Sequence, residues 1–134
     1  MNTVHHSAGY LFELLTHPQA FAIKAEKMIP VEVLNRVPIL VATGVSGILG
    51  AGALASRLNL PVGVVRKDND KTHSMYRVEL PAVAVNSPWI FVDDLVDTGQ
   101  TKTRVRKAIS SIEGYRGEFL GTYLYESNVW QYQK

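Results

Sequence analysis

Short runs of consecutive apolar residues alternate with helix-like segments along this sequence, and this alternation constrains the fold more than any other feature. The runs at residues 39–41 and 62–65 are rich in β-branched side chains, as expected of strands buried on both faces. Residues 47–58 lie between them and are small and apolar, which permits a helix to pack closely against a sheet. This order is that of a βαβ unit, which is almost always right-handed with parallel strands.

A second unit of the same kind follows. Residues 89–92 form another continuous apolar run, residues 101–112 are predicted to be helical, and a further strand is predicted around residues 119–125. A helix is also expected over residues 18–28, and residues 77–85 are expected to add a paired segment. The order predicts an α/β fold with an open, mostly parallel sheet flanked by helices. A ligand site is then expected beyond the carboxyl ends of the strands.

The composition agrees with a single domain over residues 1–134. Hydrophobic residues make up 46% and charged residues 19% of the chain, unlike the charge-rich profile of disordered proteins. There are no cysteines, which excludes disulfides, thiolate metal sites and a thiol nucleophile and agrees with a reducing cytoplasm. No apolar run reaches the length that spans a bilayer, and the first residues do not resemble a signal peptide. We therefore expect a cytoplasmic protein without a membrane partner.

The most specific motif is WIFVDDLVDTGQT, where a buried strand leads into two carboxylates and then into a turn that opens a helix. Asp93 and Asp94 can accept hydrogen bonds from the vicinal hydroxyls of a ribose or from the water around a cation. At the helix start, unpaired N–H groups and the helix dipole favour an anion, and Gly99 lets the backbone approach a phosphate. Thr98 and Thr101 add hydroxyl donors. One short segment can therefore hold a sugar and a phosphate together.

Two further segments are ambiguous when taken alone. Residues 42–47 (ATGVSG) lie between a strand and a helix, but the glycines miss the dinucleotide-binding spacing, and ordinary helix packing is the preferred explanation of this segment taken alone. Residues 64–74 (VVRKDNDKTHS) form either a solvated charged loop or a mobile basic loop that closes over an anionic leaving group.

Together these motifs resemble those of type I phosphoribosyltransferases, and the resemblance runs from about Tyr10 to Tyr125. It implies that Asp93 and Asp94 face the ribose hydroxyls of 5-phosphoribosyl 1-pyrophosphate. The residues that would wrap the 5-phosphate are Asp97, Thr98, Gly99, Gln100 and Thr101, with Asp97 also near the reacting carbon. Backbone amides would reach the pyrophosphate from Thr43, Gly44, Val45, Ser46 and Gly47.

The basic loop is similar to that of the orotate branch of this family. The matching residues, expected to stabilise the leaving group, are Arg66, Lys67, Lys71 and His73. The resemblance thus implies transfer of a phosphoribosyl group to a base, orotate or a purine, with Asp97, Lys71 and His73 as catalytic residues. It also implies Mg²⁺ bound mainly through the substrate, and a homodimer. By the same resemblance, the basic amino-terminal segment of the base-recognising hood is absent or reduced to residues 1–10, so the identity of the acceptor base stays open.

Other interpretations compete with this one. A regulatory protein that senses the same ligand without catalysis is the main alternative, and a helix with four cations could then contact nucleic acid. Those cations are Lys102, Arg104, Arg106 and Lys107. A net charge of +2 is too small to indicate a nucleic-acid partner, and a solvated helix surface explains these cations. A nucleotide hydrolase is disfavoured because no lysine-containing phosphate loop is present. Tyr123, Tyr125 and Trp130 fit a base-stacking surface, a core or a subunit contact equally well.

Overall fold

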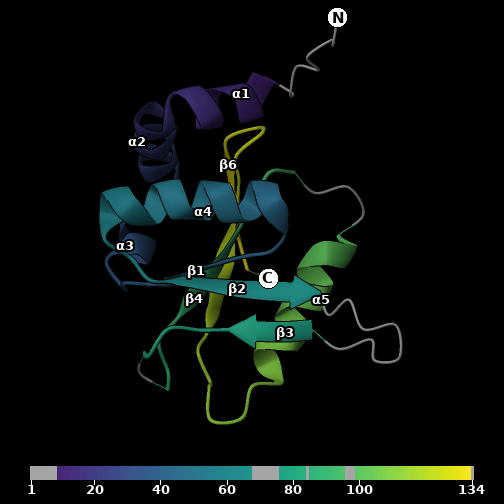
Figure 1. The fold of residues 1–134 in the computed structure, drawn as a ribbon. Helices are drawn as coiled ribbons and strands as arrows, with labels where there is room; N and C mark the ends of the chain where they lie inside the picture. The colour runs from purple at the N-terminus through teal and green to yellow at the C-terminus, as the bar shows by residue number, and fades with distance from the viewer. Residues whose placement is uncertain (1–8, 68–75, 84, 96–98, 134) are drawn as a thin grey trace, which may run out of the picture.

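A six-stranded sheet forms the centre of the part of the chain that the computed structural model describes, which is residues 9–67, 76–83, 85–95 and 99–133 (Figure 1). The strand order is β3-β2-β1-β4-β5-β6. The four central strands pair in parallel, and the two edge strands are antiparallel to their neighbours. The strands are β1 (Ile39–Ala42), β2 (Val62–Lys67), β3 (Tyr76–Glu79), β4 (Trp89–Asp93), β5 (Phe119–Leu124) and β6 (Val129–Tyr132).

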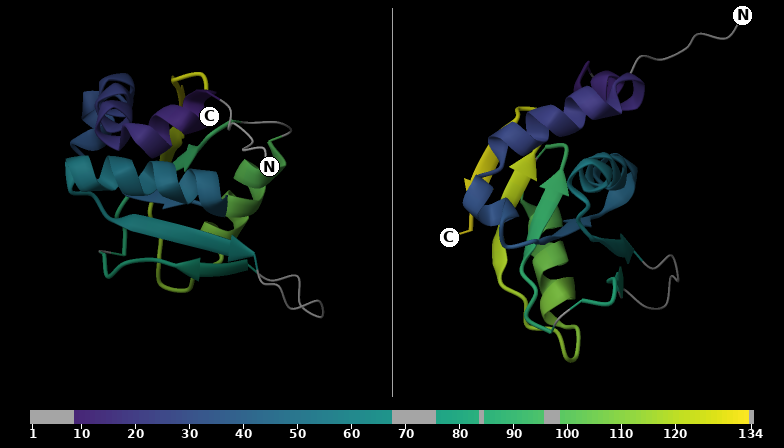
Figure 2. Two further views of the ribbon diagram at one scale, coloured as in Figure 1. Left: turned by 45° about the horizontal axis from the view of Figure 1, so that its top comes forward. Right: turned by 90° about the vertical axis from the view of Figure 1, so that its left-hand side faces the viewer.

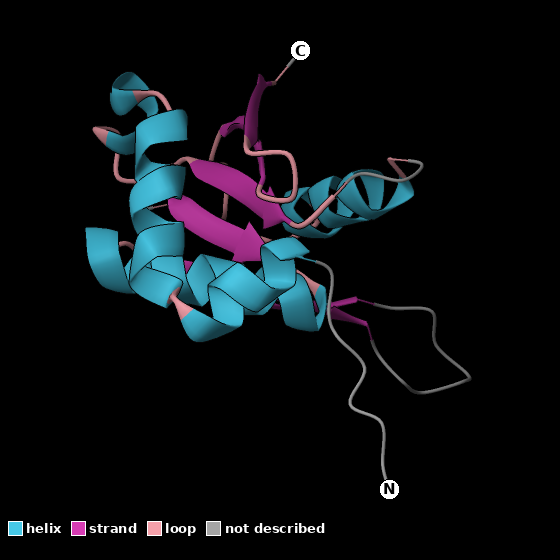
Figure 3. Ribbon diagram, turned by 90° about the horizontal axis from the view of Figure 1, so that it is seen from above, coloured by secondary structure: helices cyan, strands magenta, loops and turns pink. Residues whose placement is uncertain are grey.

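Helices cover both faces of this sheet, and most of them lie on one side. One face carries α1 (Gly9–Thr16), α2 (Pro18–Met28), α3 (Val31–Leu34) and α4 (Gly44–Leu58), and the other carries α5 (Gln100–Ser110). Figures 2 and 3 show the strands between α5 and the remaining helices. The prediction of an open, mostly parallel sheet flanked by helices is therefore confirmed.

The two faces of β1 enter two separate cores. Leu40 and Ala42 pack with the four-helix side, whereas Ile39 and Val41 pack beneath α5. All four side chains are fully buried. A strand covered on both faces needs apolar residues at every position, because neither set of alternating side chains reaches water. This explains why the sequence shows a continuous apolar run instead of an alternating one.

The helix after β1 begins earlier than the sequence predicts. It was expected over residues 47–58, but α4 starts at Gly44, with Thr43 alone between it and the strand. Gly44 has a φ of +74°, in the left-handed region that glycine adopts without strain, so the chain turns from strand to helix without a loop. The helix then ends at Asn59, which also adopts the left-handed conformation.

Other differences lie mainly at the ends of the chain and at the sheet edges. The sequence pattern predicts neither α1 nor α3, and it does not predict β6 as a strand. The pairing expected over residues 77–85 is confined to β3, and α5 spans residues 100–110 instead of 101–112. Edge strands with one exposed face lack the continuous apolar pattern that reveals the buried ones.

None of the helices in the described parts of the chain has the length and apolarity needed to cross a membrane.

Candidate functional site

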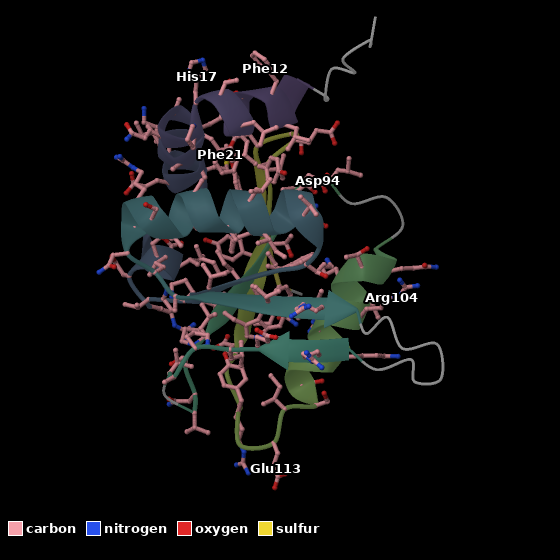
Figure 4. The ribbon with its side chains drawn as sticks, viewed as in Figure 1. Phe12, His17, Phe21, Asp94, Arg104 and Glu113 are labelled. Atoms are coloured by element: carbon pink, nitrogen blue, oxygen red, sulfur yellow. The ribbon has the colours of Figure 1, made fainter. Side chains whose placement is uncertain are left out.

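The carboxyl ends of the parallel strands bring the predicted motifs to one edge of the sheet. The end of β1 leads through Thr43 into α4, and β4 ends at Asp93, which Asp94 follows. Figure 4 shows Asp94 beside the amino-terminal end of α4, although 48 residues separate it from Ser46 in that helix. The motifs at residues 42–47 and 89–101, which are distant in sequence, therefore share one site.

The two aspartates at the end of β4 have different surroundings. Asp93 is buried, with 8% of its surface exposed, whereas Asp94 is half-buried. The backbone N–H of Asp94 donates to Oδ1 of Asp93 at 2.9 Å, and the N–H of Leu95 donates to Oδ1 of Asp94 at 2.8 Å. These local bonds orient both carboxyl groups at the strand end. A carboxylate oxygen can accept more than one hydrogen bond, so this strand end can also receive hydroxyl donors of a ligand.

Burial, followed by the adjacent Asp94 carboxyl, raises the pKa of Asp93 to about 7, although the hydrogen bond from the Asp94 backbone N–H acts in the opposite direction. A buried carboxyl next to another carboxyl holds its proton because the charged form is poorly solvated and is repelled. A cation or several hydroxyl donors bound at this edge would favour the ionised form. The protonation of Asp93 is therefore sensitive to what the site binds.

The first turn of α4 lies directly against the end of β4. A Cβ at Gly47 would stand 3.3 Å from the carbonyl oxygen of Val92 and 3.6 Å from Oδ1 of Asp93, so glycine permits this close approach. The Ser46 hydroxyl donates to Oδ2 of Asp94 at 3.2 Å. The first N–H groups of a helix have no intrahelical acceptor, and the helix dipole favours an anion near them. An anion site beside two carboxylates suits a ligand that has both hydroxyls and phosphates.

The neighbouring strands support this turn from both sides. Thr43 Oγ1 donates to the carbonyl oxygen of Val65 at 2.6 Å, which links the turn to β2. The Tyr125 hydroxyl donates to the carbonyl oxygen of Ser46 at 3.0 Å, and the Tyr125 N–H donates to the carbonyl oxygen of Asp93 at 3.0 Å. Tyr125 thus contacts both halves of the site. The sequence offers no signal for this supporting role, because it arises only when the strands pair.

The aromatic residues that were considered for base stacking lie in the core. Tyr123 is fully buried and Tyr125 is 4% exposed, with its ring 5.0 Å from Phe21 in an edge-to-face contact. Trp130 is half-buried against the same core. Of the three alternatives, core packing is the one that agrees with the structure for Tyr123 and Tyr125.

The start of α5 is the third component of this edge. Gly99 precedes the helix with a φ of +81°, which is in the left-handed region, and its carbonyl oxygen accepts from both the N–H and Oγ1 of Thr103 at 3.1 Å. Gln100 and Thr101 are exposed in the first turn. Asp97 and Thr98, which the family resemblance assigns to the same phosphate loop, lie outside the described residues.

Two of the four predicted loop cations are described. Arg66 is exposed near the end of β2 and forms an ion pair with Glu79 of β3 at 3.3 Å, and Lys67 is the last residue of β2. Lys71 and His73 lie outside the described residues. Because Arg66 and Lys67 close a strand parallel to β1, their backbone lies at the same edge as the α4 turn.

Asp93 and Asp94 are the only predicted site carboxylates in the described parts of the chain. Nowhere in those parts do three or more His, Cys, Asp or Glu side chains gather as a metal site. Two carboxylates fit a hard cation such as Mg²⁺, which binds few protein ligands and keeps oxygens of water and substrate phosphates.

No protein-family model matches the sequence, and no curated protein is significantly similar to it. Solved structures with a similar fold include an adenine phosphoribosyltransferase, with a TM-score of 0.63 at 22% identity over 83% of this chain and 71% of that one. The adenine phosphoribosyltransferase of Thermoanaerobacter pseudethanolicus has a TM-score of 0.56 at 24% identity, over 81% and 71%. The UMP synthase of Leishmania donovani has a TM-score of 0.53 at 20% identity over 84% of this chain, which spans 23% of that protein.

Proposed function

We propose that this chain, which has the fold of the type I phosphoribosyltransferases, is an enzyme that transfers the 5-phosphoribosyl group from 5-phosphoribosyl 1-pyrophosphate to a nitrogenous base. Orotate or a purine is the proposed acceptor, and pyrophosphate is the second product. A homodimer in the cytoplasm is part of the same proposal.

One observation carries the proposal. An acidic pair at the end of β4, the first turn of α4 and the start of α5 meet at one sheet edge, and the Ser46–Asp94 hydrogen bond of 3.2 Å joins the first two. A ribose diol needs acceptors, and two phosphate groups need separate clusters of N–H donors. A helix start alone would suit a simple anion, and an acidic pair alone would suit a cation or hydroxyl groups, whereas this edge offers all three components.

In the proposed reaction, the bond between the anomeric carbon and the pyrophosphate oxygen breaks and a bond from that carbon to a ring nitrogen forms. The ring-nitrogen proton leaves to solvent or to a basic group. Asp93 and Asp94 would hold the ribose hydroxyls, the Thr43–Gly47 amides would bind the pyrophosphate, and the segment from Asp97 to Thr101 would bind the 5-phosphate. Positioning the two reactants and stabilising the departing charge are the main contributions expected of the protein.

Mg²⁺ would supply positive charge to the leaving pyrophosphate when bound. Among the described residues, Asp93 and Asp94 are the ones that would face its water or substrate ligands. Their role is to accept hydrogen bonds in the ionised form, which a neighbouring cation favours over the protonated form that burial imposes on Asp93. Arg66 and Lys67, together with Lys71 and His73, are the proposed stabilisers of the leaving group.

The test is pyrophosphate release from 5-phosphoribosyl 1-pyrophosphate and Mg²⁺ in the presence of orotate, uracil, adenine, guanine, hypoxanthine or xanthine. Asp93→Asn and Asp94→Asn should abolish release, because each loses a charged acceptor for the ribose. Glu118→Gln is the matched control, since this exposed carboxylate lies at the opposite end of the sheet beside the start of β5.

Release with one base, lost in the aspartate variants and kept in the control, would establish the transferase and name its acceptor. If no base supports pyrophosphate release, the proposed transferase activity is wrong. If calorimetry then still detects Mg²⁺-dependent binding of 5-phosphoribosyl 1-pyrophosphate, the alternative of a non-catalytic regulatory protein that senses this ligand replaces the transferase proposal.

A further inference from the structure

Thr43 lies between the end of β1 and the start of α4, and its hydroxyl donates to the carbonyl oxygen of Val65 in β2 at 2.6 Å. The Thr43 backbone is extended, with a φ of −141° and a ψ of 152°, so this residue continues the direction of β1. Val65 is only 1% exposed. Because water does not reach a carbonyl oxygen buried in this way, the oxygen needs a donor from within the protein.

The regular ladder between β1 and β2 would assign a different donor to this oxygen. The Leu40 N–H donates to the carbonyl oxygen of Pro61 at 2.8 Å, and the register of the two strands continues without a shift. In parallel strands, every second residue of β1 donates to β2. Four residues further along both strands, the pattern reaches the N–H of Gly44 and the carbonyl oxygen of Val65. The Thr43 hydroxyl therefore takes the place of the Gly44 N–H.

This exchange of donors leaves the Gly44 N–H without a backbone acceptor among the described residues. Gly44 is exposed, and a Cβ added to it would meet no atom of the described structure within 4 Å. Threonine is a common cap of the next N–H groups of a helix, but within the described residues the Thr43 side chain forms no such bond in α4. The first N–H groups of α4 are therefore available to a ligand, and Gly44 is the most open of these positions.

The same turn adjoins both other parts of the proposed site. Ser46, two residues after Gly44, donates to Asp94 at 3.2 Å, and Val65 is followed in β2 by Arg66 and Lys67. A pyrophosphate bound at the start of α4 would thus be close to the carboxylates proposed for the ribose and to the end of the basic strand. A hydrogen bond from an N–H group to such an anion is stronger than one to a neutral carbonyl oxygen.

We propose that Thr43 is a positioning residue of the transferase site, whose hydroxyl occupies Val65 so that the Gly44 N–H stays available to the leaving pyrophosphate. The inference rests on the proposed function and adds a residue whose side chain acts through a neighbouring backbone group. Without the hydroxyl, the buried Val65 oxygen takes the Gly44 N–H, β1 lengthens, and the first turn of α4 loses a donor. A purely structural role of Thr43 would instead lower stability and leave the affinity for pyrophosphate unchanged.

Three variants test this role. Thr43→Val keeps the shape of the side chain and removes the hydroxyl, and Thr43→Ser keeps the hydroxyl. Thr16→Val is the matched control, because the Thr16 hydroxyl donates to the carbonyl oxygen of Phe12 at the same distance of 2.6 Å, within α1. Calorimetry measures the binding of inorganic pyrophosphate with Mg²⁺. Steady-state kinetics give the KM for 5-phosphoribosyl 1-pyrophosphate and for the base, and NMR follows hydrogen exchange of the Gly44 amide.

In Thr43→Val, the dissociation constant of pyrophosphate and the KM for 5-phosphoribosyl 1-pyrophosphate should rise about tenfold, as expected when one hydrogen bond to a charged group is lost. The KM for the base should not change. Thr43→Ser should restore the native values, and Thr16→Val should keep them. The Gly44 amide should exchange rapidly in the native protein and slowly once pyrophosphate is bound, whereas in Thr43→Val it should exchange slowly even without the ligand.

The inference is wrong if the native protein does not bind pyrophosphate, if Thr43→Val binds it with native affinity, or if Thr43→Ser fails to restore the loss. A Gly44 amide that is already protected in the native protein without ligand would also overturn it, and this measurement decides alone if Thr43→Val does not fold.

The two proposals can fail separately. Transfer to a base with a native KM in Thr43→Val would contradict the role of Thr43 alone. Pyrophosphate binding that depends on Thr43, without transfer to any base, would contradict the transferase and keep the role of Thr43 in holding pyrophosphate.

Discussion

The Ser46 hydroxyl donates a hydrogen bond to Asp94 across 3.2 Å, and this bond joins the first turn of α4 to the end of β4. Both groups are partly buried, and the acceptor is a carboxylate oxygen. A hydrogen bond to a charged group contributes about 1.5–3 kcal/mol in favourable cases. Because it connects the proposed pyrophosphate and ribose sites, its loss should affect substrate binding as well as stability.

We therefore expect Ser46→Ala to raise the KM for 5-phosphoribosyl 1-pyrophosphate several-fold, since Asp94 loses an orienting donor. The loss in unfolding free energy should be about 1–2 kcal/mol. Steady-state kinetics and urea unfolding measure the two effects. Ser46→Thr keeps a hydroxyl and should restore most of the affinity. A Thr variant as impaired as the Ala variant would contradict the role of this bond.

Gly47→Ala should destabilise the protein by about 1–3 kcal/mol, because the added Cβ would press against the Val92 carbonyl oxygen, a backbone atom that moves little. Gly52→Ala is the matched control in the same helix. Nothing lies within 4 Å of a Cβ there, so alanine should stabilise the helix by about 0.5–1 kcal/mol. Urea unfolding of both variants measures the difference. Equal effects of the two substitutions would show that α4 does not press on β4.

The free energy of unfolding should depend on pH because Asp93 has different pKa values in the folded and unfolded states. Its pKa in the folded protein is about 7, above its ordinary value of 3.8, so the folded state binds more protons than the unfolded state between these values. The contribution of Asp93 to the free energy of unfolding is fully present below about pH 4 and is lost as the pH rises through 7.

Unfolding free energies at several pH values between 4 and 8, for the native protein and Asp93→Asn, measure this effect. The native protein should lose stability relative to the variant as the pH rises. Parallel profiles would mean that Asp93 titrates at its ordinary pKa.

Tyr125→Phe removes the hydroxyl that donates to Ser46 but keeps the ring against Phe21. The expected loss is about 1 kcal/mol of unfolding free energy, whereas Tyr125→Ala should cost about 3–5 kcal/mol because it leaves a cavity in the core. Thermal or urea unfolding separates the two. Similar losses would show that the ring packing is unimportant.

Removal of divalent cations should stop pyrophosphate release without changing the melting temperature. In the described parts of the chain, no three His, Cys, Asp or Glu side chains gather as a metal site. We therefore expect the folded state to persist when divalent cations are removed. Activity and thermal unfolding are measured with and without EDTA. A lower melting temperature in EDTA would point to a structural metal.

The buried strands were predictable because strands covered on both faces require apolar residues at every position. β1 and β4 are covered on both faces, so they appear as continuous apolar runs, and the segments that follow them are recognisable by their glycines and carboxylates. The edge strand β6 and the short helix α3 were missed, since an element that buries few residues leaves a weak pattern.

The sequence by itself determined the order of strands and helices and the motifs at their ends, because local periodicity and turn residues depend only on neighbours in the chain. The tertiary structure decided the strand order, the Ser46–Asp94 contact, the support from Tyr125 and the bond from Thr43 to Val65. Each of these joins segments that are distant in sequence, and only the packing of a complete sheet against its helices decides which of them meet.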